Sequence, residues 1–255
     1  MLENIIERTK QKGRGVLVAG LAGLISLSSI FYGCEKENIS MPIDPDKTIM
    51  LTFDDGPDAV YTSRILDILK EENVKATFFL VGNNMKKYPG VTNRIFKEGH
   101  LVGNHTTDHS HLVGQPFGKV YSNIMSTQKM IDSVYRLVDS SYDNSIKYFR
   151  PPWGLITQSQ KDSLTKHGFK IILWDINSKD WSKTYDYNMI IDKVLSDVYY
   201  ASKNEVILFH TNGYNYPDPP QDGLRGGKET AKALPRIIDV LKERGYVFKT
   251  VAEAN

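Results

Sequence analysis

From about residue 47 to the end of the chain, short apolar runs alternate with longer amphipathic stretches. Runs rich in β-branched and aromatic residues predict buried strands, and stretches with apolar residues at i, i+3 and i+4 predict helices. Strands are expected at Thr48–Phe53, Ala76–Val81, Leu101–Asn104, Ile146–Arg150, Lys170–Trp174, Glu205–His210 and Val247–Val251. Helices are expected at Val60–Glu72, Val91–Glu98, Phe117–Val138, Thr157–His167, Tyr187–Ala201 and Lys228–Arg244. This alternation predicts an α/β fold whose seven or so parallel strands form a closed or distorted (β/α) barrel.

The N-terminal part has a different pattern. An uncharged run, Gly15–Gly33, follows several basic residues and ends immediately before Cys34. This arrangement resembles a bacterial lipoprotein signal, with cleavage before Cys34 and acylation of its thiol. A single membrane-spanning helix is the alternative, because the run is about long enough to span a bilayer, and an ordinary cleaved secretion signal is the third reading.

We therefore divide the chain into a signal or anchor segment at 1–34, a polar tether at 35–46 and one domain at 47–255. All three readings of the first segment place the domain outside the cytoplasm, in the cell envelope or secreted. Composition adds two limits. The single cysteine excludes an intramolecular disulfide, and a net charge of +2 gives no reason to expect nucleic acid as a partner.

Two acidic residues end the first predicted strand. Asp54 and Asp55 are followed at once by Gly56-Pro57, so the carboxylates lie at the mouth of a site. Neighbouring strand residues point in opposite directions, which predicts different roles for the two acids, one as a metal ligand and one as a base.

Histidines complete a possible metal site. His105 and His109 are spaced i, i+4, so on a helical turn they would share a face. Two imidazoles and the Asp55 carboxylate suit a catalytic zinc or a similar divalent ion with positions left open. A further histidine, His210, ends another predicted strand, whereas His100, His111 and His167 belong to no motif.

With these residues in view, the sequence resembles the polysaccharide deacetylase family, which is the NodB-homology domain of carbohydrate esterase family 4. Five segments match in order, over roughly residues 47–253: Thr52–Gly56, His105–His109, Arg150–Gly154, Asn177–Trp181 and Leu208–His210. The chain departs from the family pattern at two positions. Asn177 stands where the fourth motif usually begins with Asp, and Trp153 stands where the third usually has an aromatic such as Tyr.

The resemblance implies hydrolysis of a sugar N-acetyl group in a NodB-like barrel with one divalent ion, zinc first, with cobalt or nickel as alternatives. Asp55, His105 and His109 would hold the ion, and Asp54 would be the general base. His210 would be the general acid, paired with Asp180, and Arg150 would hold Asp54. The Trp153 backbone N–H would bind the oxyanion, while Trp181 and Leu208 would wall a pocket for the acetyl methyl group.

The resemblance leaves three functions open. The first is N-deacetylation of peptidoglycan N-acetylglucosamine, a chitin-like oligomer or an exopolysaccharide. The second is an O-acetyl esterase acting on a polysaccharide such as xylan, and the third is a non-catalytic carbohydrate-binding protein. Residues 211–228 form a long patternless stretch that reads as a lid or binding loop, or as a surface insertion. The sequence does not identify the glycan or the oligomeric state.

Overall fold

The structure is a computed structural model that describes residues 47–139, 141–201, 204–211 and 225–254. The N-terminal segment with Cys34, the tether and most of the 211–228 stretch lie outside the described residues. Among the described helices, none is both long enough and apolar enough to span a membrane.

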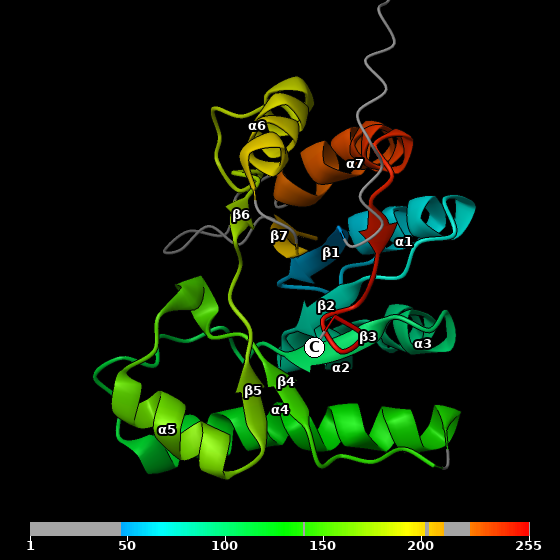
Figure 1. Ribbon diagram of the computed structural model, residues 1–255. Coiled ribbons are helices and arrows are strands. Elements are labelled where there is room, and N and C mark those ends of the chain that lie inside the picture. Colours follow the sequence, from blue (N-terminus) through cyan, green and yellow to red (C-terminus); the bar gives the residue numbers. More distant parts are fainter. Residues whose placement is uncertain (1–46, 140, 202–203, 212–224, 255) are drawn as a thin grey trace, which may run out of the picture. The chain divides into compact units, whose positions relative to one another are not determined.

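One parallel sheet organises the described residues (Figure 1). Its strands are β1 (Thr48–Asp54), β2 (Thr77–Leu80), β3 (Leu101–Asn104), β4 (Lys147–Phe149), β5 (Phe169–Ile171), β6 (Ile176–Asn177), β7 (Asn204–His210) and β8 (Val247–Phe248). Their order is β5-β4-β3-β2-β1-β7-β6, with β8 beside the start of β1. All of these pairings are parallel.

The strand order is that of a barrel opened at one place. Strands β5 and β6 are consecutive in the chain but lie at opposite ends of the sheet, and residues 172–175 run between them (Figure 1). The predicted distorted barrel of parallel strands is therefore confirmed. Strand β6 was not predicted, because two residues are too short to show a periodic pattern.

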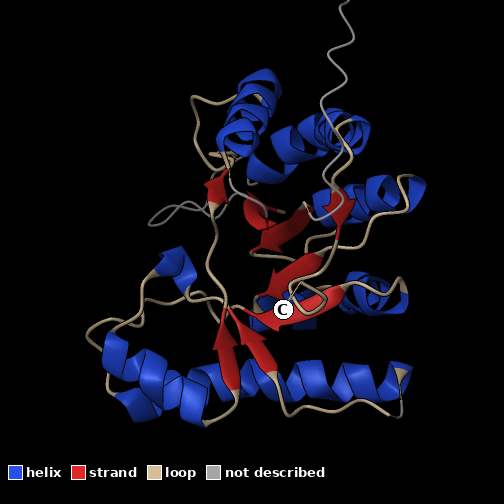
Figure 2. Cartoon of the chain, in the orientation of Figure 1, coloured by secondary structure: helices blue, strands red, loops and turns tan. Residues whose placement is uncertain are grey.

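Helices lie along the outer side of the curled sheet (Figure 2). They are α1 (Tyr61–Glu71), α2 (Gly82–Lys87), α3 (Pro89–Lys97), α4 (Phe117–Val138), α5 (Gln158–Lys166), α6 (Tyr187–Tyr200) and α7 (Arg225–Glu243), with a short 3-10 turn at Pro152–Gly154. Sequence patterns predicted all of these helices except α2 and the 3-10 turn. Gly168 and Gly245 follow α5 and α7 with φ of 81° and 78°, the left-handed conformation that ends helices.

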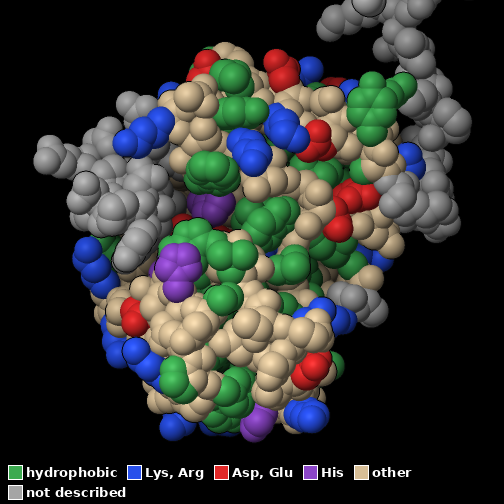
Figure 3. All heavy atoms as spheres, turned by 90° about the vertical axis from the view of Figure 1, so that its left-hand side faces the viewer, with side chains coloured by type: hydrophobic (Ala, Val, Ile, Leu, Met, Phe, Trp, Pro, Cys, Tyr) green, Lys and Arg blue, Asp and Glu red, His purple; other side chains and the backbone are tan. Residues whose placement is uncertain are grey.

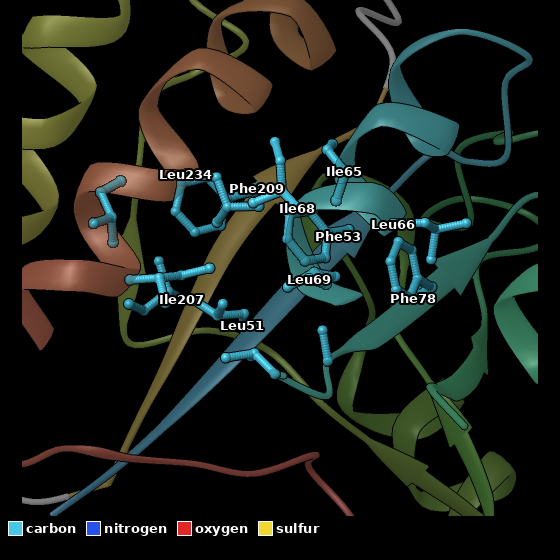
Figure 4. Packing of buried hydrophobic residues seen from close by; sticks show 14 of the residues in the cluster. Leu51, Phe53, Ile65, Leu66, Ile68, Leu69, Phe78, Ile207, Phe209 and Leu234 are labelled. Atoms are coloured by element: carbon cyan, nitrogen blue, oxygen red, sulfur yellow. The ribbon is translucent and has the colours of Figure 1, made fainter. Parts of the chain in front are cut away.

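The alternation of side chains along β1 and β7 separates the core from the site. Leu51, Phe53 and Phe209 pack outward against α1 and α7, where they are fully buried (Figure 4). Each such side chain contributes about 1.5–3 kcal/mol when it is removed from water. Thr52, Asp54, Leu208 and His210 have the opposite parity and so face the concave side. The register pairs Asp54 with His210, so the predicted base and acid lie on adjacent strands at the same sheet edge.

Candidate active site

Asp55, His105 and His109 converge at the carboxyl ends of β1 and β3. The Nε2 atoms of His105 and His109 lie 3.4 and 3.2 Å from Asp55 Oδ1. All three side chains are buried, and their ligand atoms lie within 4.8 Å of one another. Among the described residues this is the group of histidine and acidic side chains that could hold a metal ion.

The two histidines do not lie on a helical turn, so that part of the sequence prediction is wrong. Residues 105–116 are non-helical, and Thr106 and His109 have φ of 69° and 57°. These left-handed residues fold the segment back, so that both imidazoles reach Asp55. Asp55 is also left-handed, with φ of 71°, and it leaves the strand geometry. The two carboxylates therefore converge on His105 instead of diverging: its Nε2 lies 3.8 Å from Asp54 Oδ2.

The hydrogen bonding of His105 fits a metal ligand. Its Nδ1–H donates to the Arg150 carbonyl over 2.7 Å, because a carbonyl can only accept. The lone pair is thereby placed on Nε2, the atom that faces Asp55. A backbone partner that fixes the tautomer is the usual support of a metal-binding histidine. Two imidazoles and a carboxylate suit a borderline divalent ion such as zinc.

Burial and charge together set the protonation of this group. Burial opposes ionisation of Asp55, but the neighbouring imidazoles of His105, His109 and His210 outweigh it and lower its pKa to about 2. Burial lowers the pKa of His109 to about 4, although Asp55 acts in the other direction. Asp55 is thus ionised and His109 neutral near pH 7, which are the forms that bind metals.

Asp54 is held by Arg150, the most deeply buried charged side chain among the described residues. Arg150 is fully buried, and its Nη1 donates over 2.8 Å both to Asp54 Oδ1 and to the Thr52 hydroxyl. Its Nε and Nη2 donate to the carbonyls of Ile172 and Leu173, in the segment that joins β5 to β6. The guanidinium therefore fixes the Asp54 carboxylate and ties the open side of the barrel to β1.

The packing below Arg150 explains a glycine in β3. The guanidinium carbon lies 4.2 Å from the centre of the Phe79 ring. Gly103 pairs with Phe79, and a Cβ at this position would lie 2.5 Å from that ring. Gly103 thus makes room for the ring that supports Arg150.

His210, which is partly exposed, pairs with the buried Asp180 on the other side of Asp54. His210 Nδ1 lies 2.7 Å from Asp180 Oδ1, and the His210 backbone N–H donates to Asp180 Oδ2 over 2.6 Å. Burial disfavours the imidazolium, but the Asp180 carboxylate outweighs it, with help from Asp55 and Asp54, and raises the pKa of His210 to about 9. His210 is therefore a charged proton donor at neutral pH, and its other ring nitrogen, Nε2, carries the proton that it can transfer.

The ring of Trp153 packs against His109, one of the three candidate metal ligands. The indole lies 4.4 Å from the His109 ring and stacks on His111 at 3.7 Å with an interplanar angle of 10°. His111 belongs to none of the sequence motifs, and only its position close to His109 in the sequence could have suggested a role. Its ring supports Trp153, whose side chain is 37% exposed and whose φ of 56° is left-handed.

The fourth and fifth motifs place Trp181 and Leu208 differently. Trp181 is 47% exposed at the surface, whereas Leu208 is buried in β7 beside Thr52 and Asn177. The Asn177 side-chain oxygen accepts from the Lys179 N–H and from the Trp181 indole, at 3.0 and 3.4 Å. An aspartate would accept the same bonds, so the asparagine conserves the local turn. Figure 3 shows histidine side chains among hydrophobic ones on one face of the molecule.

Backbone strain is concentrated in four of the five motifs. Six described residues other than glycine have φ in the left-handed region, and five of them belong to the motifs: Asp55, Thr106, His109, Trp153 and Lys179. Such conformations cost on the order of 1–3 kcal/mol each and persist where the surroundings enforce them, most often at functional sites.

Comparisons with known proteins agree with this geometry. Residues 42–172 match the family described as polysaccharide deacetylase. A peptidoglycan-N-acetylglucosamine deacetylase of Bacillus cereus is 36% identical over 203 residues, which are 80% of this chain and 66% of the relative. A protein of the same name from Listeria monocytogenes is 34% identical over 82% of this chain and 39% of its own length.

This chain therefore spans slightly under two thirds of the first relative and well under half of the second. A solved peptidoglycan N-acetylglucosamine deacetylase superposes with a TM-score of 0.69 at 35% identity, covering 84% of this chain and 89% of the solved one. With the matched motifs gathered at one sheet edge, these findings show that the chain belongs to the polysaccharide deacetylase family.

Proposed function

We propose that this protein is a metal-dependent hydrolase that removes N-acetyl groups from an acetylated polysaccharide. The observation that carries the proposal is the meeting of three groups at the carboxyl ends of neighbouring strands. These are a two-histidine, one-carboxylate group, a second carboxylate held by Arg150, and a histidine kept charged by Asp180. They supply a metal site, a base and an acid on one face.

The ion proposed for Asp55, His105 and His109 is zinc, with cobalt or nickel as alternatives. When bound, it supplies a Lewis acid that lowers the pKa of a water molecule to about 7 and polarises the acetyl carbonyl. The protein residues do the rest. Asp54 accepts the proton of the attacking water, and Arg150 holds its carboxylate in place. The Trp153 backbone N–H is proposed as the donor to the oxyanion.

His210 supplies the second proton transfer. Its Nδ1–H is engaged with Asp180, so Nε2–H donates to the leaving nitrogen as the carbon–nitrogen bond breaks. An amine leaves poorly without a proton, whereas an alkoxide leaves more easily. A histidine that stays charged up to about pH 9 therefore favours an amide substrate over an O-acetyl ester. Retention of the base and of every ligand argues against a purely sugar-binding role.

Acetate release from purified glycans tests the proposal. The relatives' names make peptidoglycan N-acetylglucosamine the first substrate, followed by chitin-like oligomers and an exopolysaccharide, with acetylated xylan as the ester control. Release from N-acetylated glycans that disappears in the Asp54→Asn variant is expected. Release from xylan alone would support the esterase, and release from no glycan, with binding retained, would support the carbohydrate-binding protein.

We also propose that the N-terminal segment anchors the domain to the membrane on the outside of the cell, with Cys34 as the lipid attachment site. The basis is the apolar run that ends before this cysteine. Two or three acyl chains hold a protein on a bilayer, because each buried CH₂ contributes about 0.8 kcal/mol. Intact-mass analysis should find a mature chain that starts at acylated Cys34. An unprocessed chain that retains Met1 would instead support a membrane-spanning helix.

A further inference from the structure

One hydroxyl group of helix α7 contacts the Asp180–His210 pair. Thr230 is fully buried, and its Oγ1 donates to Asp180 Oδ2 over 2.6 Å, across fifty residues of sequence. No motif of the sequence includes this residue, and nothing in its local pattern marks it as more than a helix position.

The hydroxyl of Thr230 is directed away from its own helix. Hydroxyls within helices commonly bond back to the carbonyl four residues earlier. Thr92 and Thr165 do so here, at 3.0 and 2.9 Å, as do Ser126 and Ser163. Thr62 and Thr127 instead bond to the side chains of Asp58 and Thr107, outside their helices. Thr230 also bonds to a side chain outside its helix, and its partner is the carboxylate that holds the His210 ring. That choice points to a role for the bond beyond local helix structure.

The bond completes the surroundings of the Asp180 carboxylate. Oδ2 receives the Thr230 hydroxyl and the His210 backbone N–H, while Oδ1 receives the His210 ring N–H. Asp180 is only 1% exposed, so water cannot replace a lost donor easily. Two donors on Oδ2 fix the plane of the carboxylate, and this plane directs Oδ1 toward His210 Nδ1.

We infer that Thr230 is a positioning residue of the general acid, the outer member of a hydroxyl–carboxylate–imidazole chain formed with Asp180 and His210. The inference rests on the proposed function for its catalytic meaning. Without the hydroxyl, Oδ2 keeps one donor, and the buried carboxylate gains by turning toward other partners or by binding a proton. Either change takes negative charge away from the His210 ring.

Any effect of Thr230 on the pKa of His210 must act through Asp180. The charged groups that influence His210 are Asp180, Asp55 and Asp54, which favour its imidazolium, together with His109 when that ring is charged. Thr230 carries no charge, and its removal changes none of the others directly. A fall in the pKa of His210 in a Thr230 variant therefore reports a change in how Asp180 is placed.

The test compares Thr230→Val, which keeps the volume but removes the hydroxyl, with Thr230→Ser, which keeps the hydroxyl. Thr92→Val is the matched control, because Thr92 is also a buried helical threonine but bonds only to backbone carbonyls. The readouts are acetate release against pH and the pKa of His210 measured by NMR of the imidazole ring. The NMR titration does not depend on turnover.

For Thr230→Val we expect kcat to fall about tenfold at pH 10 and less than about twofold at pH 8 and below, because the loss follows the protonated fraction of His210. KM should be unchanged, since the buried side chain is placed away from the substrate. The His210 pKa should fall from about 9 toward about 8. Thr230→Ser should restore both values, and Thr92→Val should lower thermal stability without moving either.

An unchanged or higher His210 pKa in Thr230→Val would overturn the inference, as would a loss that Thr230→Ser does not rescue. If Thr230→Val does not fold, the smaller Thr230→Ala variant takes its place with the same expectations. If the wild-type protein releases no acetate from any glycan, the proposed function fails, and the NMR titration still decides the role of Thr230.

Discussion

The Asp180→Asn variant gives the sharpest test of the acid assignment, because the structure sets the size of the effect. The substitution preserves shape but removes the charge that faces His210 Nδ1 at 2.7 Å. Asp180 is 1% exposed, so solvent screens this interaction little. Burial disfavours the charged form of the His210 imidazole, and the Asp180 carboxylate is the group that favours it most. Removal of this carboxylate therefore lowers the pKa of His210 from about 9.

The expected loss grows with pH. With a pKa of about 9, roughly nine-tenths of His210 is charged at pH 8, whereas with an ordinary value near 6.5 only about 3% is charged. The protonation difference alone then lowers the rate about thirtyfold at pH 8. The loss shrinks as the pH falls toward the lowered pKa, and with a value of about 6.5 it is less than about twofold at pH 6.

The assay is kcat for acetate release between pH 6 and 10, at saturating substrate and fixed metal concentration. The alkaline limb of the wild-type profile should lie near pH 9 and move to about pH 6.5 or lower in Asp180→Asn. A pH-independent reduction would mean that Asp180 acts by shape alone. An alkaline limb that stays in place would refute both the pairing and the role of His210 as the acid.

Three further outcomes are expected. His105→Ala or His109→Ala should lose most of an ion otherwise bound at about one per chain, by elemental analysis of dialysed protein, and full retention in either variant would contradict the ligand assignment. Asp54→Asn should keep the metal but lose activity by about 10²–10⁴, the usual contribution of a general base, and near-normal turnover of the loaded variant would contradict that role. Gly103→Ala should lower the free energy of unfolding by about 1–3 kcal/mol in urea titrations, because the new Cβ displaces the Phe79 ring under Arg150; unchanged stability would mean that this ring moves freely.

Local patterns of hydrophobic and polar residues predicted most of the strands and helices. Strand β3 and helix α4 occur at the predicted bounds, because a short buried run and a long amphipathic stretch each have an unambiguous period. Helix α2 and strand β6, with six and two residues, have no period to read. The open side of the barrel between β5 and β6 also leaves no mark in the sequence, because strand order depends on pairings between distant segments.

The sequence by itself determined which residues could do the chemistry, since Asp54, Asp55, His105, His109 and His210 stand at the ends of recognisable strands and in recognisable motifs. Only the tertiary structure decided how they meet. The two histidines reach Asp55 through left-handed residues, where the sequence spacing predicted a helical turn. The partners that orient the site, such as the carbonyl of Arg150 on His105 and the hydroxyl of Thr230 on Asp180, come from segments 45 and 50 residues away. A hydrogen bond between distant segments has no periodic signature along the chain, and only the folded arrangement of the strands and helices brings its two atoms together.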